Sequence, residues 1–157
     1  MATARRRPVP PPVWFAAALV LQRMLTRHRL PTAASRTTFG VLTAASGLVA
    51  ISSVAALARA GTEISPTHPE RSTVLVTDGP FRFSRNPVYL ALAGILVAHA
   101  ALRRSVAALS VAVGFIVVMD RTQIPAEEQA LSKRFTRAYD SYRQATPRWI
   151  GRPPVRR

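Results

Sequence analysis

The segment "FGVLTAASGLVAISSVAALA" constrains the fold of this chain more than any other. It runs from Phe39 to Ala58, which is twenty residues without a charged side chain. A helix of about 20 apolar residues is long enough to cross the hydrocarbon core of a bilayer. The segment therefore predicts a membrane-spanning helix. Small residues spaced four apart, Ser46 and Ala50 and then Ser52 and Ala56, are typical of close packing against another helix.

Three further apolar segments accompany this one, so that the predicted membrane segments are about residues 13–29, 39–58, 87–102 and 105–122. The last two have apolar runs of about 15 residues each, or roughly 22 Å of helix, and we expect a tight hairpin. The first follows three arginines, a pattern that secretory signals share. The preceding prolines and the lack of an obvious cleavage site favour a membrane helix. Residues 1–12 are basic and rich in proline, which predicts disorder.

The chain changes character at Pro125, after which apolar residues recur every three to four positions. This spacing predicts an amphipathic cytosolic helix over about residues 125–145, lying on the lipid head groups, with Trp149 as an interface anchor. Residues 151–157 form a basic tail. The predicted fold is an all-α integral membrane helical bundle of about four membrane segments plus this helix, with residues 13–150 as a single domain.

The charge of the chain is strongly positive, with 22 Lys and Arg against 7 Asp and Glu. Because the apolar residues form long blocks with the charge between them, the excess favours contact with anionic lipid and not with nucleic acid. With the termini inside, the inner loops carry 16 basic residues and the outer loops five, so both termini are predicted to be cytoplasmic. The chain has no cysteine, and its three histidines lack ligand spacing, so we expect no metal site.

Residues 59–87 and the C-terminal segment are then on one face of the membrane. A turn is expected at residues 77–80, and Asn86 is a predicted N-cap because Pro87 begins the next helix. Glu127 and Glu128, at the start of the C-terminal helix, are expected on the same face of the membrane. Carboxylates close to a bilayer are costly unless they are paired or serve a site. They equally suit the positive end of a solvated helix, and the residues alone leave both interpretations open.

The stretches "LVTDGPFRFSRNPVYLAL" and "PAEEQALSKRFTRAYDSYRQATPRWI" resemble the isoprenylcysteine carboxyl methyltransferase family. They are most similar to the bacterial membrane methyltransferases grouped with it and with the phospholipid N-methyltransferases. The resemblance covers about residues 61–150. It implies a small helical membrane enzyme that uses S-adenosylmethionine, with the cofactor on the cytosolic side and a lipophilic acceptor arriving from the bilayer.

The resemblance also implies roles for individual residues. Arg85, Asn86, Pro87, Val88 and Tyr89 match the family's Arg-His-Pro-x-Tyr motif, and Glu127 and Glu128 match its acidic pair. The implied cofactor-binding residues are Thr73, Val74, Leu75, Val76, Phe81, Asn86 and Glu127. The implied catalytic residues are Arg85, Tyr89 and Glu128.

Two departures bear on the substrate. Asn86 stands where the eukaryotic motif has histidine, and it cannot titrate near neutrality. Gln123 stands where the eukaryotic enzymes have an arginine tied to the acceptor, which weakens the case for a prenylcysteine carboxylate.

The predicted function is methyl transfer to a hydrophobic or lipid-like acceptor at the cytosolic face of a bacterial inner membrane. The acceptor and the oligomeric state stay open. A membrane reductase of the sterol type, using a nicotinamide cofactor, and a non-catalytic membrane protein are the alternatives.

Overall fold

The computed structural model describes residues 9–26, 30–61 and 73–151, and every regular element in that part of the chain is helical. The helices are α1 (Pro11–Leu25), α2 (Ala33–Arg59), α3 (Pro87–Arg103), α4 (Val106–Val118) and α5 (Ile124–Ala145), with a 3₁₀ turn, η2 (Gly79–Arg82), and a π-helical turn, η3 (Met119–Gln123). The predicted all-α class is confirmed. The predicted disordered N-terminus and basic tail fall mostly on residues 1–8 and 152–157, which lie outside the described residues.

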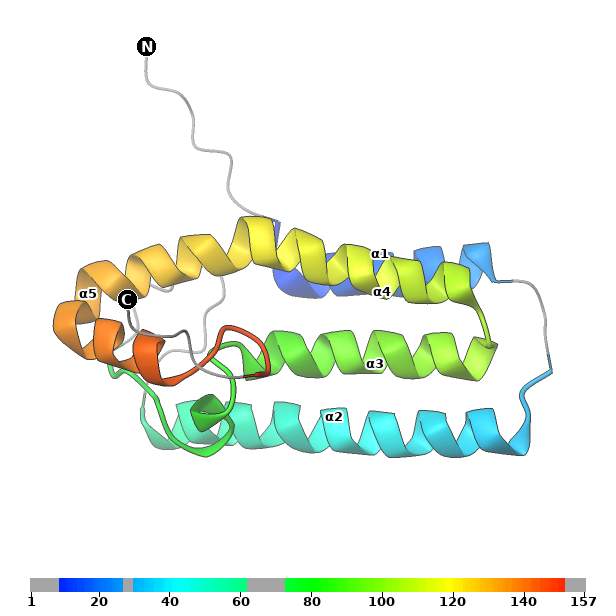
Figure 1. Cartoon of the computed structure of the whole chain (residues 1–157), viewed down its shortest axis with the longest axis horizontal. Helices are drawn as coiled ribbons and strands as arrows, with labels where there is room; N and C mark the ends of the chain where they lie inside the picture. The colour runs from blue at the N-terminus through cyan, green and yellow to red at the C-terminus, as the bar shows by residue number, and fades with distance from the viewer. Residues whose placement is uncertain (1–8, 27–29, 62–72, 152–157) are drawn as a thin grey trace, which may run out of the picture.

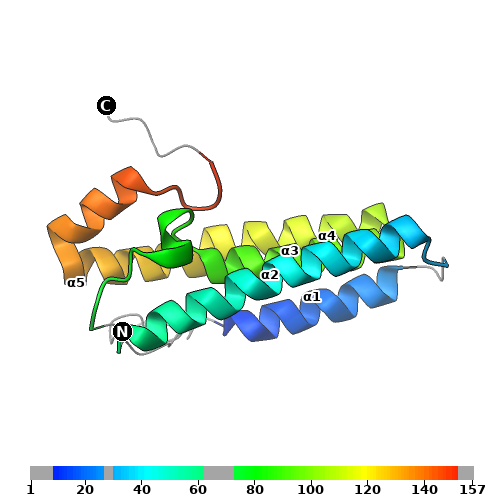
Figure 2. The same ribbon diagram turned by 90° about the horizontal axis from the view of Figure 1, so that it is seen from below.

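Helix α3 lies at the centre of the bundle. Helix α2 packs along one side of it, α4 returns on the other side to form the predicted hairpin, and α1 packs mainly on α4 (Figure 1). Figure 2 shows the same four helices from below, running alongside one another. Three large apolar side chains, Leu96, Met119 and Ile124, have no exposed surface and join α3 to the α4–α5 junction. The core therefore runs along the bundle and ends where α5 begins.

The contact between α2 and α3 depends on small residues. A Cβ atom placed on Gly94 would lie 2.2 Å from the Oγ of Ser46. Ser46 and Ala56 are buried, in agreement with the spacing of small residues in the sequence. Ser52, in contrast, turns its hydroxyl back to donate to the carbonyl of Leu48 at 2.6 Å. Close approach of the two backbones gives extensive dispersion contact, which is how helices associate in lipid.

The outer surface of the bundle is apolar. By length and composition, α2 and the continuous helix from Val106 to Ala145 could each cross a membrane, and α3 is a shorter apolar helix. Large apolar side chains point outward from both long helices; they are Val41, Leu48, Ile51 and Val54 on α2, and Val106, Leu109, Val113 and Val117 on α4. Such a continuous apolar surface is covered by lipid in a membrane protein.

Helices α4 and α5 are not separate elements as the sequence had suggested. They form one rod through the π turn η3, visible along the top of Figure 1. Pro125 has no N–H group, and its ring would crowd the carbonyl four residues earlier in an uninterrupted α-helix. The wider π turn, in which the Ile124 N–H donates to the carbonyl of Met119, absorbs this defect. Pro125 therefore marks a π turn within a continuous helix and not the start of a separate helix.

A sharp bend interrupts α5 at Thr136, whose backbone has φ 39° and ψ −113°. A β-branched residue with positive φ is strained, so surrounding contacts must hold it. The bend folds the end of α5 back toward the loop that precedes α3 (Figure 1). This return places the C-terminal residues over the start of α3.

Candidate active site

The loop before α3 forms the first wall of the candidate site. This site loop, residues 73–86, includes η2. Gly79, the first residue of η2, has φ +57°, a backbone conformation that would be strained in a residue with a side chain. The Phe81 N–H donates to the carbonyl of Asp78 at 3.1 Å, so a turn is present where composition predicted one. Val76 is buried and Leu75 partly buried, whereas Thr73 and Val74 are exposed.

Glu127 is the centre of the polar cluster at the start of α5. Its Oε1 accepts a short hydrogen bond from the hydroxyl of Tyr89 and a second one from the Nε2 of Gln123 at 2.9 Å. Burial raises the pKa of Glu127, the hydrogen bonds from Tyr89 and Gln123 lower it, and the charge of Glu128 raises it further. The carboxylate is thus oriented by two neutral donors.

Glu128 is held differently, between two guanidinium groups. Its Oε1 lies 3.1 Å from the Nη1 of Arg85, and both its oxygens face Arg148, with the Nε–Oε1 distance 3.1 Å and the Nη2–Oε2 distance 2.5 Å. The Nη1 of Arg148 also reaches Asp120 at 3.2 Å. The side chains of Arg85 and Glu128 are only 9% and 13% exposed. Glu128 is therefore neutralised inside the protein.

The tail segment, residues 146–150, packs on this cluster and forms hydrogen bonds with residues 84–86. The Arg85 N–H donates to the carbonyl of Pro147 at 2.9 Å, and the carbonyl of Arg148 accepts from the Oγ of Ser84 at 3.2 Å and the Nδ2 of Asn86 at 2.9 Å. Asn86 is the N-cap residue of α3 as predicted, and its carbonyl accepts from the Leu90 N–H at 3.0 Å. Its side chain makes no cap hydrogen bond, because the amide donates to the tail segment instead.

Trp149 is held by contacts within the protein. Its Nε1–H donates to Asp120 at 3.0 Å, and its ring packs against the apolar core. Its role as an interface anchor stays a prediction.

The bent end of α5 contributes two tyrosines. Tyr139 is 1% exposed, and its hydroxyl accepts from the Nη1 of Arg85 at 3.4 Å. The hydroxyl of Tyr142 donates to the carbonyl of Phe81 at 2.7 Å. The two rings meet edge to face. Both side chains turn inward and attach α5 to the site loop, so they do not belong to a lipid-facing surface of the predicted amphipathic helix.

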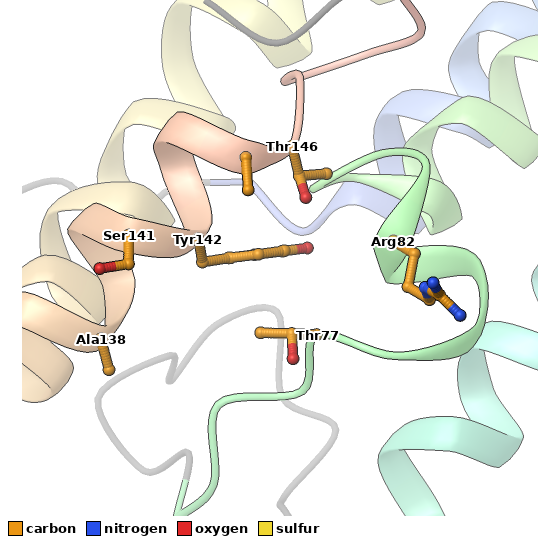
Figure 3. A pocket seen from close by; sticks show the side chains of 7 residues that line it. Thr77, Arg82, Ala138, Ser141, Tyr142 and Thr146 are labelled. Carbon is orange, nitrogen blue, oxygen red and sulfur yellow. The ribbon is translucent and has the colours of Figure 1, made fainter. Parts of the chain in front are cut away.

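A pocket of about 450 Å³ opens beside this attachment (Figure 3). It is lined by Thr77, Arg82, Ala138, Ser141, Tyr142, Ala145 and Thr146. Figure 3 shows Tyr142 between the bent end of α5 and the site loop, with Arg82 across the opening. This volume lies within the range of small-molecule sites.

The structure brings together only some of the predicted site residues. Arg85, Asn86, Tyr89, Glu127 and Glu128 form one connected polar cluster with the tail segment. The predicted residues 73–76 have other contacts, among them a hydrogen bond from Thr73 Oγ1 to the carbonyl of Gly61 at 3.4 Å. Phe81 is attached through its carbonyl.

Sequence reasoning did not assign Arg148 to the site, because it counted this arginine only as part of the cytoplasmic charge. The residues of "TPRWI" carry no periodicity, and the family resemblance that includes them implied no role for any of them. Asp120 pairs with Arg148 of the tail segment at 3.2 Å and lies 4.0 Å from its sequence neighbour Arg121.

A helical bundle with apolar outer side chains and a polar cluster at one end is consistent with a membrane protein that has a site at one face. The chain matches the phospholipid methyltransferase family over residues 35–138, about two-thirds of its length, and it belongs to that family. No curated protein matches the chain. The family match covers α2, the site loop, α3, α4 and the acidic pair, and it ends before Tyr139 and the tail segment. The protein is accordingly a membrane methyltransferase.

Proposed function

We propose that the protein transfers a methyl group from S-adenosylmethionine to a hydrophobic or lipid-like acceptor at the cytosolic membrane face. One observation carries this proposal. Three acidic side chains meet at the α4–α5 junction, and Asp120 and Glu128 both have arginine partners. Glu127 has no cationic partner in the described part of the chain and is bound only by Tyr89 and Gln123. A positively charged ligand would complete it.

The cluster fits the charges of this cofactor. S-adenosylmethionine carries a sulfonium, an ammonium and a carboxylate, and when bound it supplies the methyl group and leaves as a neutral thioether. Glu127 would hold a positive group, since charge-assisted hydrogen bonds are the stronger ones. The Nε of Arg85 is buried without a partner in the described residues, and such a donor fits a carboxylate.

The protein's part in the reaction is alignment and exclusion of water. Methyl transfer to oxygen, nitrogen or sulfur is a displacement along one line, which benefits from fixed geometry more than from a strong acid or base. Tyr89 fixes Glu127 from α3, and the tail segment and Tyr139 cover Arg85. The apolar outer faces of α2 and α4 suit an acceptor that is dissolved in lipid.

The site would face the cytosol. With both termini inside, the inner segments hold 16 of the basic residues against five outside, so we place the protein in a bacterial inner membrane with this orientation. Gln123 donates to Glu127 where an arginine would carry charge, which supports an acceptor other than a prenylcysteine carboxylate.

Binding of S-adenosylhomocysteine to the detergent-purified protein, followed by calorimetry, tests the proposal. We expect saturable binding by the wild type and about a 100-fold loss in Glu127→Gln, as for a removed charge in a desolvated pair. Asp140→Asn, an exposed acid of α5, is the matched control and should bind normally. Failure of folded wild-type protein to bind would refute the cofactor assignment.

A further inference from the structure

Arg148 joins more parts of the site than any other residue of the tail segment. Its guanidinium contacts Glu128 and Asp120, while its carbonyl accepts from Ser84 and Asn86. This single residue of the tail segment therefore connects the start of α5, the π turn and the site loop. It lies beyond residue 138, where the family match ends.

The arrangement of charge around Arg148 is what gives it a role toward the cofactor. Without Arg148, Asp120 would keep the neutral hydrogen bond from Trp149 at 3.0 Å, and among the described cations only Arg121 would remain within 4.0 Å of it. Glu128 would keep only the cation of Arg85. Unneutralised negative charge would then stand next to Glu127. Like charges in a partly desolvated site oppose each other's ionisation.

We infer that Arg148 is a positioning residue, which neutralises Asp120 and Glu128 and fastens the tail segment to the site loop, so that Glu127 alone receives the positive charge of the cofactor. This inference rests on the proposed function. Arg148 acts through its two carboxylate partners and through the backbone of the site loop, and it has no reacting atom of its own.

The guanidinium shape matters as well as its charge. Arg148 presents Nε and Nη2 to the two oxygens of Glu128 and a third nitrogen, Nη1, to Asp120. A planar fork can make these contacts together, whereas the ammonium of lysine is a compact point charge. Lysine at this position should keep most of the neutralisation and lose much of the attachment.

The groups that face Glu127 define what a pH experiment reports. They are Tyr89 from α3, Gln123 from the π turn, Glu128 beside it, and, through Glu128 and its partners, Arg85, Arg148 and Asp120. The pKa of Glu127 is raised by burial, and the charge of Glu128 raises it further. Loss of Arg148 should therefore move the protonation of Glu127 to higher pH.

The test is the affinity of the full-length, detergent-purified protein for S-adenosylhomocysteine between pH 5 and pH 8, with thermal unfolding of each variant as a separate readout. In Arg148→Gln we expect binding to weaken about 10- to 100-fold, as for lost outer-shell partners of a bound ion. The pH midpoint of binding should rise by about one unit, the size of shift that a nearby charge produces. Arg148→Lys should restore the midpoint but not the full affinity.

Arg143→Gln is the matched control, because Arg143 is an exposed arginine in the last turn of α5, and it should leave both quantities unchanged. The inference is overturned if Arg148→Gln binds with wild-type affinity and an unshifted midpoint. It is also overturned if the variant only unfolds at a lower temperature while its folded fraction binds normally. Wild-type protein that binds no S-adenosylhomocysteine would instead refute the proposed function, and this inference with it.

Discussion

Two polar clusters lie toward opposite ends of α3, and they differ in how well their polar groups are satisfied. Away from the site, Gln22 has no exposed surface; its Nε2 donates to the carbonyls of Leu96 and Ala108, and its Oε1 pairs with the Nδ1 of His99. Every polar atom of the Gln22 side chain is used between helices. At the site end, the Arg85 Nε has no partner among the described residues, and Glu127 has no cation.

This difference separates a structural contact from a binding site. A fully satisfied buried network stabilises and fixes helix packing, because leaving any member unpaired in a low dielectric is costly. An incomplete network persists only where other contacts hold it or a ligand completes it. The tail segment and the bent end of α5 hold the incomplete cluster here. The comparison therefore predicts that changes at the Gln22 end affect stability and changes at the site end affect binding.

The largest loss of stability is expected for Gln22→Ala. The change removes both backbone contacts and leaves His99 without its partner, which should cost about 3 kcal/mol of unfolding free energy. Thermal unfolding in detergent measures it, with Met24→Ala, 77% exposed on the same helix, as the control. Cofactor affinity of the folded protein should stay normal. A large loss of affinity at unchanged stability would break the distinction between the two clusters.

A smaller loss is expected for Gly94→Ala at the α2–α3 contact. The added methyl would meet the Oγ of Ser46 at 2.2 Å, so the helices must separate or Ser46 must rotate, at about 1–2 kcal/mol. A second change, Ser46→Ala, should restore part of the stability. Gly47→Ala is the control, because nothing lies within 4 Å of its added Cβ. An unaltered unfolding temperature in Gly94→Ala would contradict the close packing of α2 against α3.

The smallest effect concerns the pH dependence of stability. Because burial raises the pKa of Glu127 above its ordinary value of 4.5, the folded protein holds this proton more tightly than the unfolded chain does. The stabilisation is therefore complete below pH 4.5 and is lost as the pH rises through the raised pKa. We expect the unfolding temperature of the wild type to fall over this window by about 3 °C or less relative to Glu127→Gln. Parallel curves for the two proteins would show that the folded protein does not raise the pKa of Glu127.

The sequence predicted the helical bundle, and the family resemblance named residues that the structure gathers into one polar cluster. A charge-free run such as residues 39–58 has few alternatives to a helix, and the Arg85–Tyr89 segment and the acidic pair flank the same hairpin. Once α3 and α4 pack antiparallel, Tyr89 and Glu127 must approach each other.

The remaining parts of the site could not be predicted in the same way. Attachment of Tyr142 and Arg148 depends on the bend at Thr136, a strained backbone that local propensity argues against. The continuity of α4 and α5 was not predicted either, because Pro125 is a residue type that is common in the first turn of a helix and the π turn before it has no sequence signal. Contacts of these kinds are set by tertiary structure, so no spacing in the sequence reports them.

The most direct test of the account is the affinity for S-adenosylhomocysteine of the wild type and of Glu127→Gln, measured by calorimetry from pH 5 to pH 8. If Glu127 is the carboxylate that receives the cofactor's positive charge, wild-type affinity rises with pH through the raised pKa of Glu127 and then levels off. Glu127→Gln should bind weakly and without this pH dependence. Equal affinities and parallel pH profiles in the two proteins would contradict the account.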